Sequence, residues 1–151
     1  MAEEGDVHIV EGRLQVPYNN WYGGFMSGFF RDLRDHKQLR GTRCASCRKV
    51  YMPPRPICPG CFARLQDWVE LPPKGTLLTY TIVNYTYSTY YQPMADPYPV
   101  GIIKLDGADT GMCHLLGEVV PDDITIGMRV EAVFQEERKG NILDIAYFKP
   151  A

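Results

Sequence analysis

The sequence predicts a mainly β protein with N-terminal helices, in which a zinc ribbon is followed by a five-stranded barrel of the OB-fold type. Two observations lead to this prediction. Four of the five cysteines form two C-x-x-C pairs. After Gly75 the sequence changes to short β-branched and aromatic runs separated by turn residues. With 151 residues, the chain can form one modest domain or two small modules that share a core.

Residues 1–18 form the first segment and show no hydrophobic periodicity, so we expect a flexible arm with His8 as an exposed side chain. The acidic start, Met-Ala-Glu-Glu-Gly-Asp, lacks the apolar region of a signal peptide. No apolar run approaches the length of a membrane span. We therefore expect a cytoplasmic protein without a membrane partner.

Residues 19–41 are predicted to be helical. Asn19 or Asn20 can cap the helix, and a second, polar part follows from 31 to 39 with Gly41 as its candidate C-cap. The large apolar side chains recur at helical spacing: Trp21, Tyr22, Phe25, Met26, Phe29, Phe30 and Leu33. This stripe is wider than a small ribbon could cover, so the helix either packs as core or contributes to a protein–protein interface.

Residues 42–71 are predicted to form the ribbon. Cys44 and Cys47 make one C-x-x-C pair, Cys58 and Cys61 the other, and ten residues separate them. Two such pairs can complete a tetrahedral site, although spacers of about 15–20 residues are more usual. Disulfides would need an oxidising compartment, and a redox C-x-x-C motif would need a βαβ pattern, which is absent.

Zinc is the expected metal and iron the alternative, because both accept four thiolates in tetrahedral geometry. Four protein ligands leave no open coordination position, so the metal is expected to be structural. We also expect Tyr51 and Met52 to pack against the two cysteine turns.

Residues 72–151 are predicted to form the barrel, entered through a hinge or turn at Pro72–Gly75. Strands are predicted at 76–87, 98–105, 112–120, 128–136 and 142–148. Tyr90 and Tyr91 lie in the first connection. We expect them to pack on a neighbouring subunit, with stacking on bases or on an adenine as the alternative.

Cys113 and His114 are the residues that most resemble a nucleophile and its base. Neighbouring residues of a strand point to opposite faces, so the two side chains cannot form a pair. We interpret Cys113 as a small buried residue and His114 as a surface or interface histidine. Because recognisable phosphate loops and hydrolase motifs are also absent from the sequence, we name no catalytic or cofactor-binding residue.

Charge is distributed unevenly along the chain. Residues 31–64 contain nine basic and two acidic side chains, whereas residues 65–151 contain six basic and twelve acidic ones. A basic ribbon and an OB-fold both suit a nucleic-acid-binding module. The acidic barrel half argues against that function, because phosphate contacts supply most non-specific affinity.

Several motifs in this order resemble the DUF35 family, from about residue 22 to the C-terminus. They are Leu39-Arg-Gly-Thr-Arg-Cys44-Ala-Ser-Cys47, Pro53-Pro-Arg-Pro-Ile-Cys58-Pro-Gly-Cys61, Gly75-Thr-Leu-Leu-Thr-Tyr-Thr, Pro97-Tyr-Pro-Val-Gly-Ile-Ile-Lys-Leu-Asp106 and Ile126-Gly-Met-Arg-Val-Glu-Ala-Val-Phe134. The resemblance implies a rubredoxin-like zinc ribbon followed by an OB-fold associated with acyl-CoA enzymes. Arg48 departs from the family pattern, which usually has glycine after the second cysteine.

The resemblance further implies a non-catalytic accessory subunit in a hetero-oligomer with a thiolase-like enzyme. The partner would supply the nucleophilic cysteine and the histidine base. We expect thiolysis of a β-ketoacyl-CoA in degradative β-oxidation, with an aromatic substrate such as benzoylsuccinyl-CoA, and a contact with CoA at the interface. The alternatives are an accessory subunit of a MaoC-type hydratase or an aldolase, and a CoA-binding protein that uses the arginines of residues 31–64.

Overall fold

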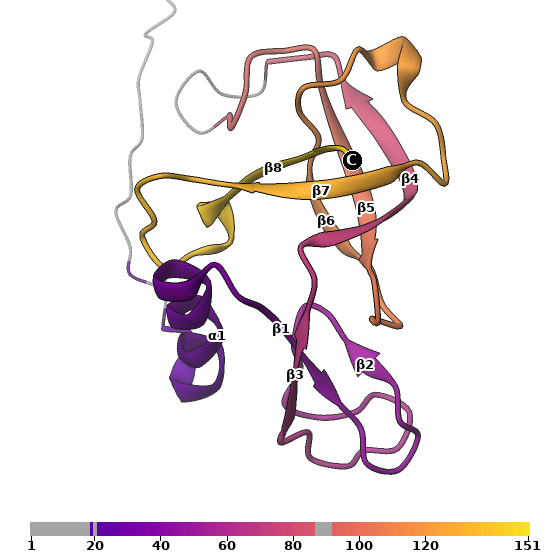
Figure 1. Ribbon diagram of the computed structural model, residues 1–151. Helices are drawn as coiled ribbons and strands as arrows, with labels where there is room; N and C mark the ends of the chain where they lie inside the picture. Colours follow the sequence, from indigo (N-terminus) through magenta and orange to yellow (C-terminus); the bar gives the residue numbers. More distant parts are fainter. Residues whose placement is uncertain (1–18, 20, 87–91) are drawn as a thin grey trace, which may run out of the picture.

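The computed structural model describes residues 19, 21–86 and 92–151. These residues form one α-helix, a three-stranded sheet and a five-stranded sheet. In Figure 1 the small sheet lies below the larger one, and the helix lies beside them. The predicted arm with His8, the candidate cap Asn20 and the loop tyrosines Tyr90 and Tyr91 lie outside the described residues.

The helix α1, Gly23–His36, lies within the segment that the aromatic periodicity predicts to be helical. Tyr22 occupies the N-cap position without a side-chain capping bond, so Asn19 is not the cap. The helix ends at His36. The next residue, Lys37, is the C-cap: its φ of 56° is left-handed, and its amide donates to the Leu33 carbonyl oxygen over 3.1 Å. The predicted polar part is therefore confirmed from residue 31 to His36. Its continuation to residue 39 and the Gly41 cap are wrong, because Lys37 turns the chain out of the helix and Leu39 begins a strand.

The two halves of α1 have different environments. Phe29, Phe30 and Leu33 are buried in the core. At the other end, Trp21 is 94% exposed and Tyr22 is 51% exposed. The core alternative thus applies to the C-terminal half of α1. The residues that precede the helix present aromatic surface, and their part in a protein–protein interface stays a prediction.

The ribbon sheet has three antiparallel strands in the order β2-β1-β3. They are β1 Leu39–Arg43, β2 Val50–Tyr51 and β3 Asp67–Leu71. Gly41 lies within β1, where a Cβ atom would be 2.8 Å from the Tyr51 carbonyl oxygen. Its small size therefore permits the close approach of β1 to β2. The cysteine-bearing loops leave the sheet after β1 and between β2 and β3.

The larger sheet has the strand order β6-β5-β4-β7-β8. Its strands are β4 Lys74–Val83, β5 Tyr98–Leu105, β6 Met112–Leu115, β7 Arg129–Phe134 and β8 Ile145–Pro150. Leu116 forms a parallel bridge with Phe148, and the Gly117 amide donates to the Phe148 carbonyl oxygen over 2.9 Å. These contacts join β6 to β8 and close the five predicted strands into a barrel.

Some strands are shorter than predicted. β4 ends at Val83 and β6 at Leu115. β8 begins at Ile145 because residues Ile142–Asp144 form a short 3-10 helix, η2, with a cap at Asn141. The Asn141 side-chain oxygen accepts the Leu143 amide over 2.8 Å, and local side-chain bonds of this kind compete with strand pairing. A second 3-10 helix, η1 Pro121–Asp123, lies between β6 and β7.

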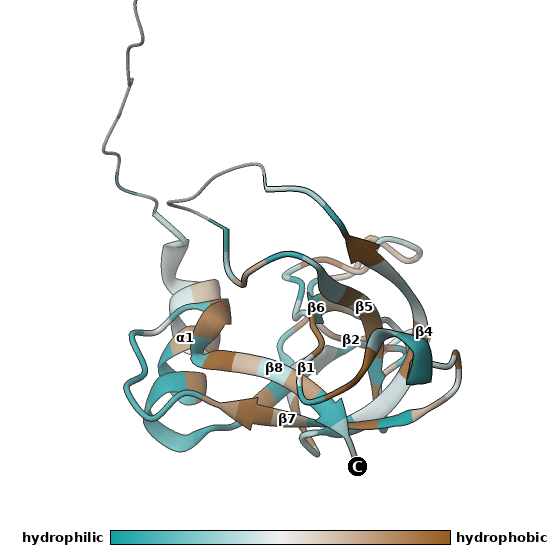
Figure 2. Ribbon diagram, turned by 90° about the horizontal axis from the view of Figure 1, so that it is seen from above, coloured by the Kyte–Doolittle hydropathy of each residue, from teal (hydrophilic) through white to brown (hydrophobic). Residues whose placement is uncertain are grey.

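One hydrophobic core joins the helix, the ribbon and the barrel. Its buried members include Phe29 and Leu33 of α1, Leu39 and Met52 of the ribbon, and Leu77, Ile103 and Phe148 of the barrel. Figure 2 shows hydrophobic stretches on α1 and on barrel strands, with more hydrophilic residues in the loops. The common set of buried residues agrees with the alternative of two small modules that share a core. Within the described ranges, the structure contains no helix with the length and hydrophobicity needed to cross a membrane.

Candidate metal centre

The four cysteines predicted as metal ligands come together beyond the end of the ribbon sheet. Their sulfur atoms all lie within 4.8 Å of one another, and the sulfurs of Cys47 and Cys58 are 3.8 Å apart. In a tetrahedral site with Zn–S bonds of about 2.3 Å, neighbouring sulfurs are about 3.8 Å apart. The arrangement can therefore hold a tetrahedrally coordinated metal ion.

Each cysteine pair lies on a turn of the same shape. The Arg48 amide donates to the Cys44 carbonyl oxygen over 2.8 Å, and the Phe62 amide donates to the Cys58 carbonyl oxygen over 2.9 Å. Arg48 and Phe62 have φ values of 61° and 56°. Glycine adopts such angles without steric cost, which explains why the family pattern that the sequence resembles usually has glycine after the second cysteine. Arg48 adopts the same turn, but its side chain makes the left-handed conformation unfavourable.

The metal centre has a buried side and an exposed side. Cys44 and Cys58 are buried, whereas Cys47 and Cys61 are exposed. Tyr51 packs with the buried pair, as predicted. Met52 does not, because it belongs to the main core shared with the helix and the barrel.

The cysteine protonation pattern depends on hydrogen bonds within the cluster. The pKa of Cys58 is lowered to about 6, chiefly by the Tyr51 hydroxyl, and the pKa of Cys47 is lowered chiefly by the Lys49 amide. Hydrogen bonds to Cys47 and Cys58 raise the pKa of Cys61 to about 12. A metal ion binds thiolates, so its binding would displace the remaining protons.

Cys113 and His114 point to opposite faces of β6, as predicted, but their environments are the reverse of those expected. Cys113 is exposed, and His114 is buried with 5% exposure. The His114 Nε2 atom lies 3.2 Å from the Ile142 carbonyl oxygen, so this nitrogen carries the hydrogen. Nδ1 lacks a partner among the described residues. The side chains cannot act as a nucleophile and its base.

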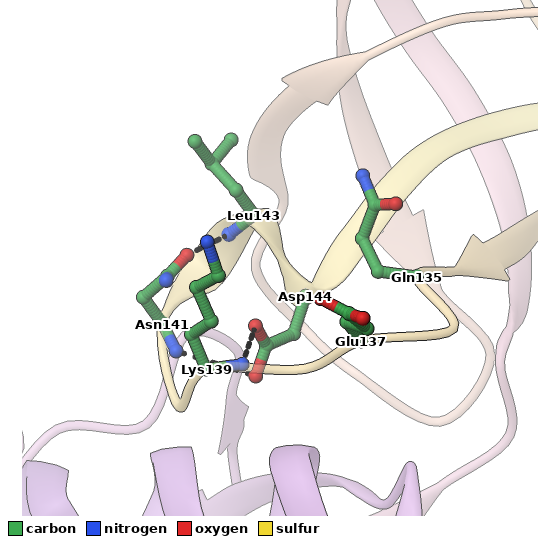
Figure 3. A pocket seen from close by; sticks show the side chains of 6 residues that line it. All are labelled: Gln135, Glu137, Lys139, Asn141, Leu143 and Asp144. Carbon is green, nitrogen blue, oxygen red and sulfur yellow. Dashed lines mark hydrogen bonds between the residues drawn. The ribbon is translucent and has the colours of Figure 1, made fainter.

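A pocket of about 440 Å³ lies beside η2 and contains the buried carboxylate of Asp144. Figure 3 shows this carboxylate turned toward the backbone amides of the preceding loop. It accepts the amides of Lys139 and Gly140 over 2.8 and 2.7 Å. These bonds satisfy the carboxylate and fix the loop, so we assign Asp144 a structural role.

A second surface feature lies between α1 and the ribbon. Phe25, Ile57 and Arg64 help to line a groove of about 360 Å³ there, and the Phe25 ring contacts the Trp68 ring with centroids 4.8 Å apart. Ile57 is 52% exposed, and Phe62, after the second cysteine turn, is 82% exposed. We call the groove residues Phe25, Ile57 and Arg64, together with the exposed Trp21 and Phe62 that are close to them in sequence, the helix–ribbon surface. Sequence periodicity indicated its helical part but not its ribbon part.

A four-cysteine ribbon joined to a closed five-stranded barrel defines the chain as a zinc-ribbon and OB-fold protein. Family models agree with this class: one for the rubredoxin-like zinc ribbon domain of ChsH2 matches residues 31–66, and one for the C-terminal OB-fold domain of ChsH2 matches residues 68–135. A DUF35 domain-containing scaffold protein of Methanocaldococcus jannaschii is 33% identical over 80% of this chain and 87% of its own length. The chain belongs to the DUF35 family.

Other similar proteins are described as a scaffold protein, as a hydratase subunit and as part of an aldolase. A DUF35 domain-containing scaffold protein of Pyrococcus furiosus is 32% identical over 76% of this chain and 81% of its own length. A protein of Thermomonospora curvata described as a probable enoyl-CoA hydratase alpha subunit is 28% identical over 83% of this chain and 37% of its own length. The solved structure of an Ltp2-ChsH2(DUF35) aldolase matches with a TM-score of 0.61 and 25% identity, over 82% of this chain and 93% of that one.

Proposed function

We propose that this chain is a non-catalytic, zinc-binding accessory subunit of an acyl-CoA thiolase complex. The observation that carries the partner-binding role is the helix–ribbon surface, on which Trp21 and Phe62 are 94% and 82% exposed. Large apolar side chains that are exposed on two elements flanking a groove indicate an interaction site. Membership of a family whose relatives are described as scaffold proteins supports the same role.

The metal in this proposal is zinc, ligated by Cys44, Cys47, Cys58 and Cys61, with iron as the alternative. Sulfur spacing suits a tetrahedral ion. With all four positions filled by protein, the zinc would hold the two cysteine loops together and would not bind substrate. We place the complex in the cytoplasm.

The reaction in this proposal is thiolysis of a β-ketoacyl-CoA in degradative β-oxidation, with an aromatic substrate such as benzoylsuccinyl-CoA. The partner would supply the nucleophile and the base. This division agrees with the opposite orientations of Cys113 and His114 and with the amide contacts that occupy Asp144.

The ribbon would also contact CoA at the interface with the partner. Asp32 and Asp35 are paired with Arg40 and Arg34. Arg43 is paired with Asp67. The other six basic residues of 31–64 have no ion-pair partner within the described ranges: Arg31, Lys37, Arg48, Lys49, Arg55 and Arg64. These side chains are available for an acidic partner surface or for the phosphates of CoA.

A second candidate is an accessory role for an aldolase or for a MaoC-type hydratase. It is favoured by the similarity to the ChsH2 chain of an aldolase structure and to a hydratase alpha subunit. A nucleic-acid-binding role is disfavoured by the excess of acidic residues in the barrel half. Titration of labelled single-stranded DNA and RNA at low salt would reveal such a role as salt-sensitive binding.

Co-expression tests the proposal. The tagged chain would be produced with the thiolase, the aldolase or the hydratase of the same source, and complexes would be isolated by size-exclusion chromatography. We expect a stable complex with the thiolase, thiolysis of a β-ketoacyl-CoA by that complex, and no thiolysis by the chain alone. Thiolysis by the chain alone, or a complex with only the aldolase or hydratase, would contradict the thiolase assignment.

A further inference from the structure

Tyr51 lies at the end of β2 with its hydroxyl directed at the metal centre. The side chain is buried with 5% exposure, and its oxygen is 3.2 Å from the sulfur of Cys58. Cys58 itself is fully buried. The contact therefore joins two groups that bulk water does not reach.

Metal coordination fixes the direction of this hydrogen bond. A metal-bound cysteine is a thiolate and can only accept hydrogen bonds, so the Tyr51 hydroxyl must be the donor. The Cys61 amide is a second donor to the same sulfur, over a longer distance of 3.4 Å. A hydrogen bond to an ionised acceptor is stronger than one between neutral groups, and burial protects it from competition with water.

The contact is not repeated in the other cysteine turn. Cys44 occupies the matching position and is equally buried, but no hydroxyl donates to its sulfur among the hydrogen bonds of the described residues. Cys58 therefore differs from Cys44 by a single side-chain donor. This difference makes Tyr51 a specific feature of the second turn and not a general consequence of ribbon geometry.

We propose that Tyr51 is a fifth functional residue of the metal centre, a positioning residue whose hydroxyl holds the Cys58 thiolate in its coordinating orientation and slows loss of the metal. The inference rests on the four-cysteine metal site and is independent of the partner enzyme. Donors to metal-bound ligands fix ligand orientation, and removing one typically weakens metal affinity by about 10–100-fold.

Tyr51→Phe removes the hydroxyl and keeps the buried ring. Tyr147→Phe is the matched control, because the Tyr147 hydroxyl donates to Glu118 over 2.6 Å on the barrel, away from the cysteines. Each full-length protein is loaded with zinc, and release to a chelator is followed with a chromogenic zinc indicator. We expect at least about 10-fold faster release from Tyr51→Phe and an unchanged rate from Tyr147→Phe.

Substitution of the zinc by cobalt(II) gives an absorption spectrum that distinguishes a hydrogen bond to sulfur from packing of the ring. A donor to sulfur lowers the energy of the sulfur lone pairs, so its removal shifts the thiolate-to-cobalt charge-transfer band to longer wavelength. We expect this shift in Tyr51→Phe and not in Tyr147→Phe. An unshifted band in Tyr51→Phe would overturn the proposal even if release were faster, since the ring would then act through packing alone. Failure of the wild-type chain to bind cobalt or zinc would overturn the metal site itself.

Discussion

Asp109 and Val50 exchange two hydrogen bonds between the barrel and the ribbon. The Asp109 carboxylate accepts the Val50 amide over 2.7 Å, and the Asp109 amide donates to the Val50 carbonyl oxygen over 2.8 Å. The next residue, Thr110, exchanges two further bonds of 2.8 Å with the backbone of Met52. The turn between β5 and β6 thereby continues along the free edge of β2 and fixes the ribbon on the barrel.

Replacement of Asp109 tests this connection. Asp109→Ala leaves the Val50 amide without its acceptor, and an unsatisfied amide at a buried site costs about 1–3 kcal/mol. We expect the unfolding free energy of Asp109→Ala, measured by urea unfolding, to fall by this amount. Asp122→Ala is the control, because Asp122 is exposed in η1 and should change stability by less than about 0.5 kcal/mol. Equal stabilities of the two variants would contradict the connection.

Local patterns made the ribbon and the strands predictable, but not how they join. The spacing of the cysteines is a local sequence feature, and it correctly predicted that the four sulfur atoms come together. The contact between Asp109 and Val50 joins residues far apart in sequence. The residues around Asp109 are ordinary turn formers, so they do not indicate that the turn binds another element. Strand alternation placed Cys113 and His114 on opposite faces but could not tell which face is buried. That choice depends on the packing of His114 against Phe148.

Burial of His114 predicts a pH-dependent stability. Desolvation lowers the pKa of this imidazole below its usual 6.5, so the unfolded chain takes up the proton first as pH falls. The contribution of the neutral, buried His114 to the unfolding free energy is therefore fully present above the imidazole pKa of the unfolded chain, which is about 6.5. It decreases as pH falls below that value and stops changing below the imidazole pKa of the folded chain. We expect His114→Gln to reduce the slope of unfolding free energy between pH 7.5 and 5.

The control for this prediction is His36→Gln, because His36 is exposed at the end of α1. Both variants keep the four cysteines, so any pH dependence from metal binding is common to them. Urea unfolding at several pH values gives the slopes. A slope in His114→Gln equal to that of the wild type would show that the buried imidazole does not contribute.

Arg48→Gly should stabilise the ribbon. The φ of Arg48 is 61°, and a left-handed conformation costs a residue with a side chain about 1–2 kcal/mol. The greater freedom of glycine in the unfolded chain offsets about 0.5–1 kcal/mol of that cost, so we expect a net gain of about 0.5–1 kcal/mol in chemical unfolding. Lys49→Gly, at a neighbour without a positive φ, should be destabilising. A loss of stability in both variants would contradict the conformational argument.

Trp21→Ala separates folding from partner binding. Trp21 is 94% exposed, so its removal should change the midpoint of thermal unfolding very little. Truncation of an aromatic hot-spot residue costs about 2 kcal/mol or more of binding free energy, so we expect affinity for the partner enzyme to fall by about tenfold or more. Ile126→Ala is the control, because Ile126 is 67% exposed on the barrel. If both variants bind like the wild type, the helix–ribbon surface is not the interface.

Cys58→Ser should abolish the fold of the ribbon, since a structural zinc ion contributes about 10–16 kcal/mol in small zinc domains. Replacement of the buried Cys58 removes a ligand and the acceptor of the Tyr51 hydroxyl together. We expect loss of bound zinc by elemental analysis and loss of the complex with the partner. Cys113→Ser is the matched control, because Cys113 is exposed and outside the cluster, and it should keep both. A folded, partner-bound Cys58→Ser protein that only slows thiolysis would instead place the metal centre in the chemistry of the reaction.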